Sequence, residues 1–156
     1  MLEGQFYQNA YVCDNIEAAI DLFRGRGLTK EPIIIPVDQQ VMTPDGLKRQ
    51  KSRICFIWIG DLQYELIESE IDEVGLYANC APNGGPMRFH HICFRIDDWN
   101  DFRARVDQQE FPVAMERTGA DPSELQFLYL DARNVFGHYI EYTWVPEAMW
   151  QQIRAM

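Results

Sequence analysis

The sequence predicts an α+β fold in which two tandem βαβββ modules form a curved, mostly antiparallel sheet around a cavity. Two observations predict it. In each half, a strand-like run leads into a segment whose apolar residues recur at helical spacing, and further strand-like runs follow. The turn from this first strand into the helix carries a matching acidic segment in each half, Asp14-Asn15-Ile16 and Asp97-Asp98-Trp99. A repeat of about 80 residues is too long for a solenoid unit and suits a duplicated module.

The first module covers about residues 5–68 and begins with a short β-prone run at residues 6–13. Asp14 followed by Glu17 predicts a helix start of the capping-box kind, and Gly25 or Gly27 predicts its end. After the helix, β-prone runs predict three strands, at residues 32–37, 53–59 and 62–68. The prolines of the first of these favour a place at a sheet edge.

The second module covers about residues 88–145 and repeats this order. Residues 89–96 predict a strand, and Asp98 predicts the start of a helix with the apolar stripe Trp99, Phe102 and Val106. Three further strands are predicted at residues 111–115, 125–130 and 138–144. Residues 69–87 link the modules, a C-terminal helix is predicted at 146–155, and we treat residues 1–156 as one domain.

Composition narrows the class of partner. The formal net charge of −10 argues against nucleic acid, because phosphate contacts need clustered Lys and Arg. The sequence has no apolar run long enough to span a membrane, and its first residues do not resemble a signal peptide. The 4 cysteines form no Cys-x-x-Cys pair, and three of them lie in apolar runs that suit buried, reduced thiols. We therefore expect a cytoplasmic protein with a small-molecule partner and no membrane or nucleic-acid partner.

Four polar side chains lie on strand faces that are predicted to point away from the helices. These residues are Gln8, Glu65, His91 and Glu141. The first and third belong to the first strand of each module, and the second and fourth to the last strand. A single strand Glu is usually solvated or ion-paired and a single His is usually structural, but this mirrored placement favours a divalent-metal site. Carboxylates inside a curved sheet are costly unless they are paired or bound to a metal.

The segments around these residues resemble the vicinal oxygen chelate superfamily, which includes glyoxalase I, methylmalonyl-CoA epimerase, bleomycin-resistance proteins and extradiol dioxygenases. The match lies in Phe89-His90-His91-Ile92-Cys93-Phe94-Arg95-Ile96-Asp97-Asp98, in Tyr64-Glu65-Leu66-Ile67-Glu68 and in Gly137-His138-Tyr139-Ile140-Glu141-Tyr142. The resemblance is to glyoxalase I-like and methylmalonyl-CoA epimerase-like members, and it covers both halves. It implies a tandem βαβββ fold and a divalent cation (Zn, Ni, Co, Mn or Mg) held by Gln8, Glu65, His91 and Glu141.

The four expected ligand residues resemble some members of this superfamily more than others. The Gln/Glu/His/Glu combination is similar to that of zinc-type glyoxalase I, whereas Gln8 and Glu65 depart from the epimerases. With Gln8 in place of a first His, the resemblance to iron-dependent dioxygenases loses most of its support. For glyoxalase I itself, the sequence lacks an Arg-Ser segment at the start of the first helix and a basic set for glutathione.

The resemblance implies a lyase or isomerase that moves a proton alpha to a carbonyl through a metal-bound enolate. We expect Glu141 to act as the principal base and Glu65 as a ligand and second base. For the substrate we expect contacts from Arg95, Tyr139 and Thr143. Small two-module members commonly form dimers, so we expect a homodimer. The competing function is a non-catalytic, bleomycin-resistance-like binding protein, and a ring-cleavage dioxygenase is the weaker alternative.

Two further histidines receive a structural interpretation. His90 and His138 lie on the strand faces that are predicted to point toward the helices. We therefore expect both to be packed and hydrogen-bonded rather than to take part in the site.

Overall fold

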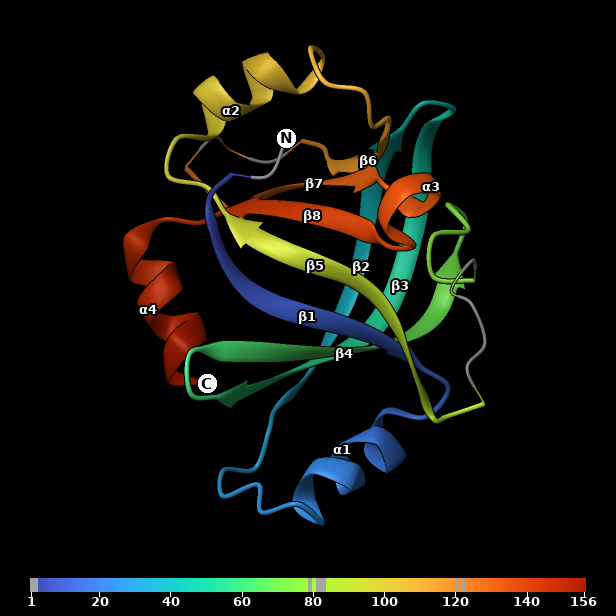
Figure 1. The fold of residues 1–156 in the computed structure, drawn as a ribbon, viewed down its shortest axis with the longest axis vertical. Coiled ribbons are helices and arrows are strands. Elements are labelled where there is room, and N and C mark those ends of the chain that lie inside the picture. The colour runs from blue at the N-terminus through green and yellow to red at the C-terminus, as the bar shows by residue number, and fades with distance from the viewer. Residues whose placement is uncertain (1–2, 79, 81–83, 120, 122) are drawn as a thin grey trace.

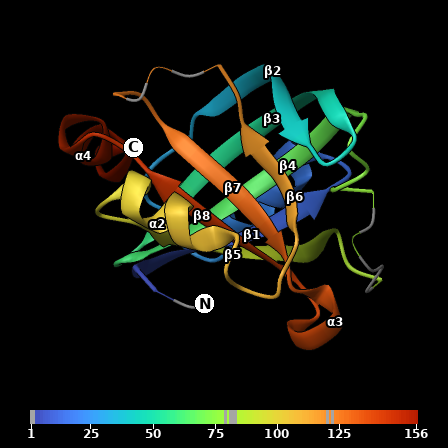
Figure 2. The same cartoon turned by 90° about the horizontal axis from the view of Figure 1, so that it is seen from above.

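Eight strands form the centre of the computed structural model, which describes residues 3–78, 80, 84–119, 121 and 123–156. They are β1 (Gln5–Cys13), β2 (Ile34–Thr43), β3 (Gly46–Ile59), β4 (Leu62–Asp72), β5 (Met87–Arg95), β6 (Val113–Arg117), β7 (Gln126–Asp131) and β8 (Tyr139–Trp144). The strands close into a barrel in the order β1-β4-β3-β2-β6-β7-β8-β5 (Figures 1 and 2). A barrel of eight strands has an interior wide enough to hold one small ligand.

The helices cover the outside of this barrel. They are α1 (Ile16–Arg24), α2 (Trp99–Val106), the short α3 (Arg133–Phe136) and α4 (Glu147–Ala155). Figure 1 shows α1 and α2 on opposite sides of the barrel. Ile16 and Ile20 of α1 pack against Leu66 of β4, and Phe102 of α2 packs against Tyr142 of β8. Because these apolar strand residues face the helices, the alternating polar residues face the interior.

The two halves contribute mirrored sets of strands to one barrel. The order of elements in residues 5–72 recurs in residues 87–144, apart from α3. The first and last strands of each half, β1 with β4 and β5 with β8, run parallel, and all other pairs are antiparallel. The predicted α+β class and curved, mostly antiparallel sheet are therefore confirmed. The two halves share one continuous sheet, because β1 pairs with β5 and β2 meets β6 at Val41 and Met42.

The starts of the two equivalent helices differ in detail. Asp98 caps α2 as predicted, since its side chain accepts a hydrogen bond from the backbone N–H of Asp101. The predicted cap of α1 at Asp14 is wrong. Asn15 caps that helix through the backbone N–H of Ala18 at 2.8 Å. The Asp14 carboxylate instead accepts a hydrogen bond from Arg88 at 2.6 Å.

Two β-bulges place adjacent residues inside the barrel. In the β1–β5 pair, Phe6 faces Phe94 and Gln8 faces Cys93, so Tyr7 has no partner in the register. Further along, Ala10 faces His91 and Tyr11 faces Phe89, so His90 is skipped in the same way. A bulge puts two residues of one strand opposite one residue of its partner and so interrupts the alternation of faces. Each first strand therefore turns two consecutive residues inward, Tyr7-Gln8 and His90-His91, and all four are buried.

The ends of the barrel are filled by different segments. At one end, Val12 and Ile67 form an apolar cluster with Leu76, Tyr77 and Tyr139. At the other end lies α4 (Figure 1). Its Trp150 packs against Tyr7 and Val145. Between these ends the interior is open as a cavity. Within the described residues, no helix is long and apolar enough to cross a membrane.

Candidate metal centre

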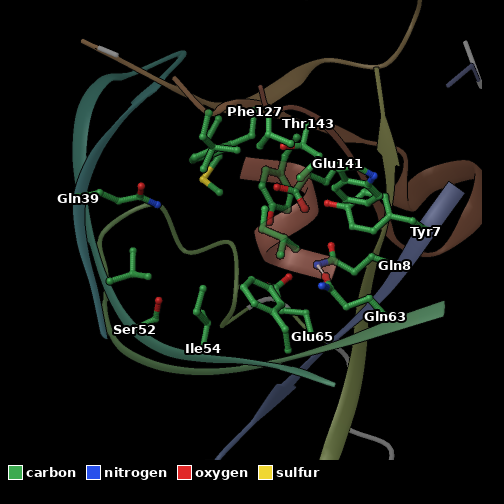
Figure 3. Close-up of a pocket in the computed structure, with 18 of the residues that line it drawn as sticks. Tyr7, Gln8, Gln39, Ser52, Ile54, Gln63, Glu65, Phe127, Glu141 and Thr143 are labelled. Atoms are coloured by element: carbon green, nitrogen blue, oxygen red, sulfur yellow. Dashed lines mark hydrogen bonds between the residues drawn. The ribbon is translucent and has the colours of Figure 1, made fainter. Parts of the chain in front are cut away.

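Two carboxylate side chains and one imidazole meet inside the barrel, each from a different strand. Glu65 of β4, His91 of β5 and Glu141 of β8 offer ligand atoms that all lie within 4.8 Å of one another. His91 Nε2 lies 3.0 Å from Glu141 Oε2 and 3.4 Å from Glu65 Oε2. Figure 3 shows Glu65 and Glu141 pointing into the same cavity from opposite walls. The whole group belongs to one chain, because the barrel closes within it.

Gln8 of β1 brings an unpartnered oxygen to the wall of the same cavity. Its Nε2 donates a hydrogen bond to Gln63 Oε1 at 2.6 Å, and the two residues are register partners of β1 and β4. Its Oε1 is buried and has no hydrogen-bond partner in the described part of the chain. A buried acceptor without a partner costs about 1–3 kcal/mol, so this oxygen is suited to a ligand or cation. Two carboxylates, an imidazole and an amide oxygen are a donor set that fits a divalent cation.

His90 orients the imidazole of His91. His90 Nε2 lies 3.2 Å from the carbonyl oxygen of Leu76, and a carbonyl only accepts, so this nitrogen carries the proton. His90 Nδ1 lies 2.8 Å from His91 Nδ1 and accepts the N–H of that ring. The other nitrogen of His91, Nε2, therefore faces the two carboxylates. A ligating His commonly donates its second N–H to such a partner, which fixes its tautomer.

Burial and charge set the ionisation of this group. Burial lowers the pKa of His90 well below its usual range, so its ring is neutral. Burial also acts against a charge on His91, but its hydrogen bonds with Glu141 and Glu65 raise its pKa to about 9. Burial raises the pKa of Glu65, and the hydrogen bond with His91 lowers it in part. Without a metal ion, the two carboxylates thus hold one imidazolium between them.

The cavity beside these residues has a volume of about 210 Å³. Its candidate ligand end carries Gln8, Glu65 and Glu141, and Figure 3 shows Gln39 and Ser52 across from them. The rest of its wall is largely aliphatic and aromatic. These apolar lining residues are Val37, Ile54, Phe56, Met115, Leu125, Phe127, Val145, Trp150 and Ile153.

The three expected substrate contacts occupy different places. Thr143 lines the cavity, and its hydroxyl donates to the carbonyl of Gln126 at 3.1 Å. Tyr139 lies in the apolar cluster at the end of the barrel, with its ring 4.9 Å from that of His90. Arg95 is not among the residues that line the cavity. It donates to Glu147 of α4 at 2.7 Å and lies 4.7 Å from the centre of the Trp150 ring.

The two histidines that were expected to be structural, His90 and His138, lie in different places. His138 stays outside and stacks on Phe136 of α3, at 6.1 Å between ring centres. His90 does not face a helix as expected, because the bulge turns it into the barrel beside His91.

Sequence reasoning missed Gln63 and Tyr7 as cavity residues. Gln63 is buried, lines the cavity, and has an Nε2 without a partner in the described chain. Its signal was available, because it precedes Glu65 by two positions and so shares its strand face. Tyr7 also lines the cavity, but alternation places it opposite Gln8, and only the bulge brings it inside.

Solved structures with the same fold include proteins of known and unknown activity. A hypothetical protein from Bacillus halodurans C-125 superposes with a TM-score of 0.59 at 16% identity, covering 92% of this chain and 95% of that one. Methylmalonyl-CoA epimerase from Mycobacterium tuberculosis gives 0.59 at 13% identity, covering 97% of both chains. A variant of the Streptomyces coelicolor methylmalonyl-CoA epimerase, in complex with 2-nitronate-propionyl-CoA, gives 0.58 at 14% identity, covering 91% and 97%. At these identities the likeness concerns the fold alone.

The sequence itself identifies the family. No curated protein sequence is significantly similar to the chain. A family model, described as Glyoxalase/Bleomycin resistance protein/Dioxygenase superfamily, matches residues 7–128. That range includes Gln8, Glu65 and His91, whereas Glu141 lies beyond it. The resemblance inferred from the sequence is thus confirmed, and the chain belongs to the glyoxalase/bleomycin resistance/dioxygenase superfamily, with the vicinal oxygen chelate fold.

Proposed function

We propose that this chain is a divalent-cation-dependent isomerase or lyase that moves a proton on a carbon next to a carbonyl group. The observation that supports this most is the pair of carboxylates, Glu65 and Glu141, which flank His91 and line one cavity. Two carboxylates facing one substrate allow a proton to be taken on one side and returned on the other.

The residues that would hold the cation are Gln8, Glu65, His91 and Glu141. The unpartnered Oε1 of Gln8 supports this, because it is a buried acceptor without a donor in the described chain, on a residue that lines the same cavity as Glu65 and Glu141. When bound, a divalent cation supplies a Lewis acid that lowers the cost of negative charge on the substrate's carbonyl oxygen.

The side chains of the chain itself divide the remaining work. The Glu141 carboxylate accepts the α-proton as the C–H electron pair moves toward the carbonyl, and the protonated Glu141 can return this proton to the same face of the substrate. For inversion at the carbon, Glu65 first takes up a proton from solvent and then returns it from the facing wall. Gln63 Nε2, which has no partner in the described residues, donates to a substrate oxygen near Gln8. The apolar wall excludes water, so these polar contacts act in a medium of low dielectric constant.

Exchange of the α-proton for deuterium tests this proposal without knowledge of the natural substrate. The chain is loaded with Zn²⁺, Ni²⁺, Co²⁺, Mn²⁺ or Mg²⁺ and incubated in D₂O with dihydroxyacetone, pyruvate or 2-hydroxyacetophenone, and exchange is followed by NMR. We expect one of these compounds to exchange faster than in buffer. The substitution Glu141→Gln is expected to lower that rate by at least about 100-fold, the usual effect of losing a general base.

Two controls sharpen this experiment. Glu110→Gln changes an exposed carboxylate far along the chain from the site and is expected to leave exchange unchanged. Metal content, measured by elemental analysis after dialysis, is expected to approach one equivalent per chain in the wild type. Less than a tenth of an equivalent after loading with each of the five cations would refute the metal-dependent reaction, and full exchange by Glu141→Gln would remove Glu141 as the base.

The aromatic and aliphatic wall also favours a second candidate function, a binding protein for an apolar ligand. Such a protein would trap the ligand in the cavity without changing it. Tight binding of a compound whose α-protons do not exchange, with or without cation, would support this alternative.

A further inference from the structure

The cavity beside the candidate metal centre is lined, among the described residues, by no Lys or Arg side chain. We propose that its ligand is an uncharged, largely apolar molecule of about one substituted ring, whose oxygens are held by neutral amide and hydroxyl groups. This inference names the class of substrate. It rests on the proposed function in one respect, that the reaction takes place in this cavity.

The positive side chains of the described residues all lie outside the cavity lining. Arg95, which was expected from the sequence to bind the substrate, instead contacts Glu147 and the face of the Trp150 ring. Arg117 does not line the cavity. It lies in a surface groove beside β2 that borders the cavity at Val37 and Gln39, and it is paired with Glu124 at 3.3 Å. The Lys and Arg residues that have no carboxylate partner in the described chain are Arg26, Lys30 and Lys48, and none of them lines the cavity.

The charges that the cavity does contain are negative. Glu65 and Glu141 carry the acidic charge of the wall, and one divalent cation would do no more than balance them. A ligand carboxylate or phosphate in the apolar part would then lack a counter-charge. Burying an unpaired charge costs several kcal/mol, so the cavity selects against anionic ligands.

Neutral groups provide the polar contacts instead. Gln63 Nε2 is a buried donor without a partner in the described chain, and the oxygen of the same amide accepts from Gln8 Nε2 at 2.6 Å. Such a donor suits a carbonyl or hydroxyl oxygen of a neutral ligand. Across the cavity, Gln39 and Ser52 offer an amide and a hydroxyl to a second polar substituent (Figure 3).

The volume limits the ligand to about one ring. An apolar cavity of about 150 Å³ takes up one benzene molecule. The present cavity, of about 210 Å³, has room for such a ring with a short oxygenated substituent. Phe127, Phe56 and Trp150 contribute aromatic surface to its wall, which suits contact with a ring.

Three compounds that share a phenyl ring and exchangeable α-protons but differ in charge test this inference. They are 2-hydroxyacetophenone (neutral), phenylpyruvate (a carboxylate) and phenylacetyl-CoA (a polyanionic thioester). Binding to the cation-loaded chain is measured by calorimetry, and deuterium exchange by NMR. We expect the neutral ketone to bind at least about tenfold more tightly than either anion, which corresponds to about 1.4 kcal/mol.

A pair of charge-matched variants locates this preference in the cavity. Gln39→Arg introduces a guanidinium into the cavity wall, whereas Gln40→Arg adds the same charge at the next residue of β2, which is exposed and does not line the cavity. We expect Gln39→Arg to improve phenylpyruvate binding at least about tenfold, enough to offset the cost of burying its charge, and Gln40→Arg to leave it unchanged. Equal improvement by both variants would refute the role of the cavity wall.

The outcomes separate this inference from the proposed function. If phenylpyruvate or phenylacetyl-CoA binds more tightly or exchanges faster than 2-hydroxyacetophenone, the neutral ligand class is refuted while the proton-transfer function stands. If 2-hydroxyacetophenone binds most tightly but none of the three compounds exchanges, the ligand class is supported and the reaction fails for it. If none of the three compounds binds, the assignment of a one-ring neutral ligand is refuted.

Discussion

At the scale of single residues, the centre depends on a chain of hydrogen bonds that runs from the backbone to the candidate ligand. The carbonyl of Leu76 accepts from His90, and His90 accepts from His91. Asp72 holds the loop that carries Leu76, because its carboxylate accepts the backbone N–H groups of Gly75 and Tyr77. The orientation of the His91 ring is thereby tied to the end of β4, outside the cavity itself.

Substitution of His90 tests this chain of hydrogen bonds. In His90→Ala, the Nδ1–H of His91 loses its acceptor, so we expect cation affinity to fall by about 10–100-fold. His90→Asn keeps an acceptor near the same position and is expected to recover part of that loss. Affinity is measured by competition with a chelator, and ¹⁵N NMR of the imidazole reports the tautomer of His91. Equal affinity in the wild type and His90→Ala would show that His90 only fills space.

Two residues show where residue-level prediction succeeds and where it ends. Glu141 was placed correctly in the interior because its neighbours Ile140 and Tyr142 form a clear apolar face against α2. His90 was placed on the wrong side because alternation fails at a bulge. That bulge arises from the register between β1 and β5, strands that lie far apart in the sequence. A local pattern carries no information on such a register.

At the scale of elements, α4 closes one end of the cavity. Trp150 is buried, with its ring at 4.9 Å from that of Tyr7, and Ile153 also lines the cavity. Trp58 donates its indole N–H to the backbone carbonyl of Ile153 at 2.9 Å. Together with the contact between Arg95 and Glu147, these interactions hold the helix over the barrel.

Removal of the Trp150 side chain is expected to destabilise the protein and enlarge the cavity. Truncation of a buried Trp to Ala costs about 3–5 kcal/mol, because packing is lost and a void remains. Trp144→Ala is the matched control, since Trp144 is half-buried on β8 and does not line the cavity. We expect a clearly smaller loss there. Urea denaturation measures both free energies, and equal losses would argue against a closing role for α4.

The elements were predictable to the extent that their signals are local. The apolar stripe and Asp98 cap of α2 are short-range features, and the prediction was confirmed. The cap of α1 was not predictable from the same rule, because Arg88, which follows Asp14 by 74 positions, binds that carboxylate and leaves Asn15 as the cap. Closure of the sheet also escaped prediction. It depends on the short pairing of β2 with β6, which the residue pattern of either strand does not predict.

At the scale of the whole molecule, folding gathers two carboxylates inside a protein whose net charge is −10. A positive charge is needed among them, since buried anions are costly without one. In the metal-free chain this charge is the proton on His91, whose pKa is raised to about 9 by Glu141 and Glu65 against the effect of burial. A bound cation would supply the same charge without the proton.

This exchange of a proton for a cation predicts how stability depends on pH. The pKa of His91 in the folded chain exceeds the value of about 6.5 expected after unfolding. Its protonation therefore stabilises the metal-free fold fully below about pH 6.5, and this stabilisation is lost as the pH rises through about 9. Binding of a cation requires release of that proton, so cation affinity increases over the same range. The rise in Tm on adding a cation is thus expected to be larger at pH 9 than at pH 6.5.

Calorimetric melting of the chain with and without excess Mn²⁺ at the two pH values measures this difference. A cation present at about 100 times its dissociation constant adds about 2.7 kcal/mol to the free energy of unfolding, which sets the scale of the expected shift. In His91→Asn there is no imidazole to carry the proton, so the rise in Tm on adding a cation should no longer depend on pH in this way. Because all four candidate ligands belong to one chain, saturation is expected at one cation per chain, whether or not the chains associate. A rise in Tm that is equal at both pH values in the wild type, or a stoichiometry of one cation per two chains, would contradict a centre built around His91 within a single barrel.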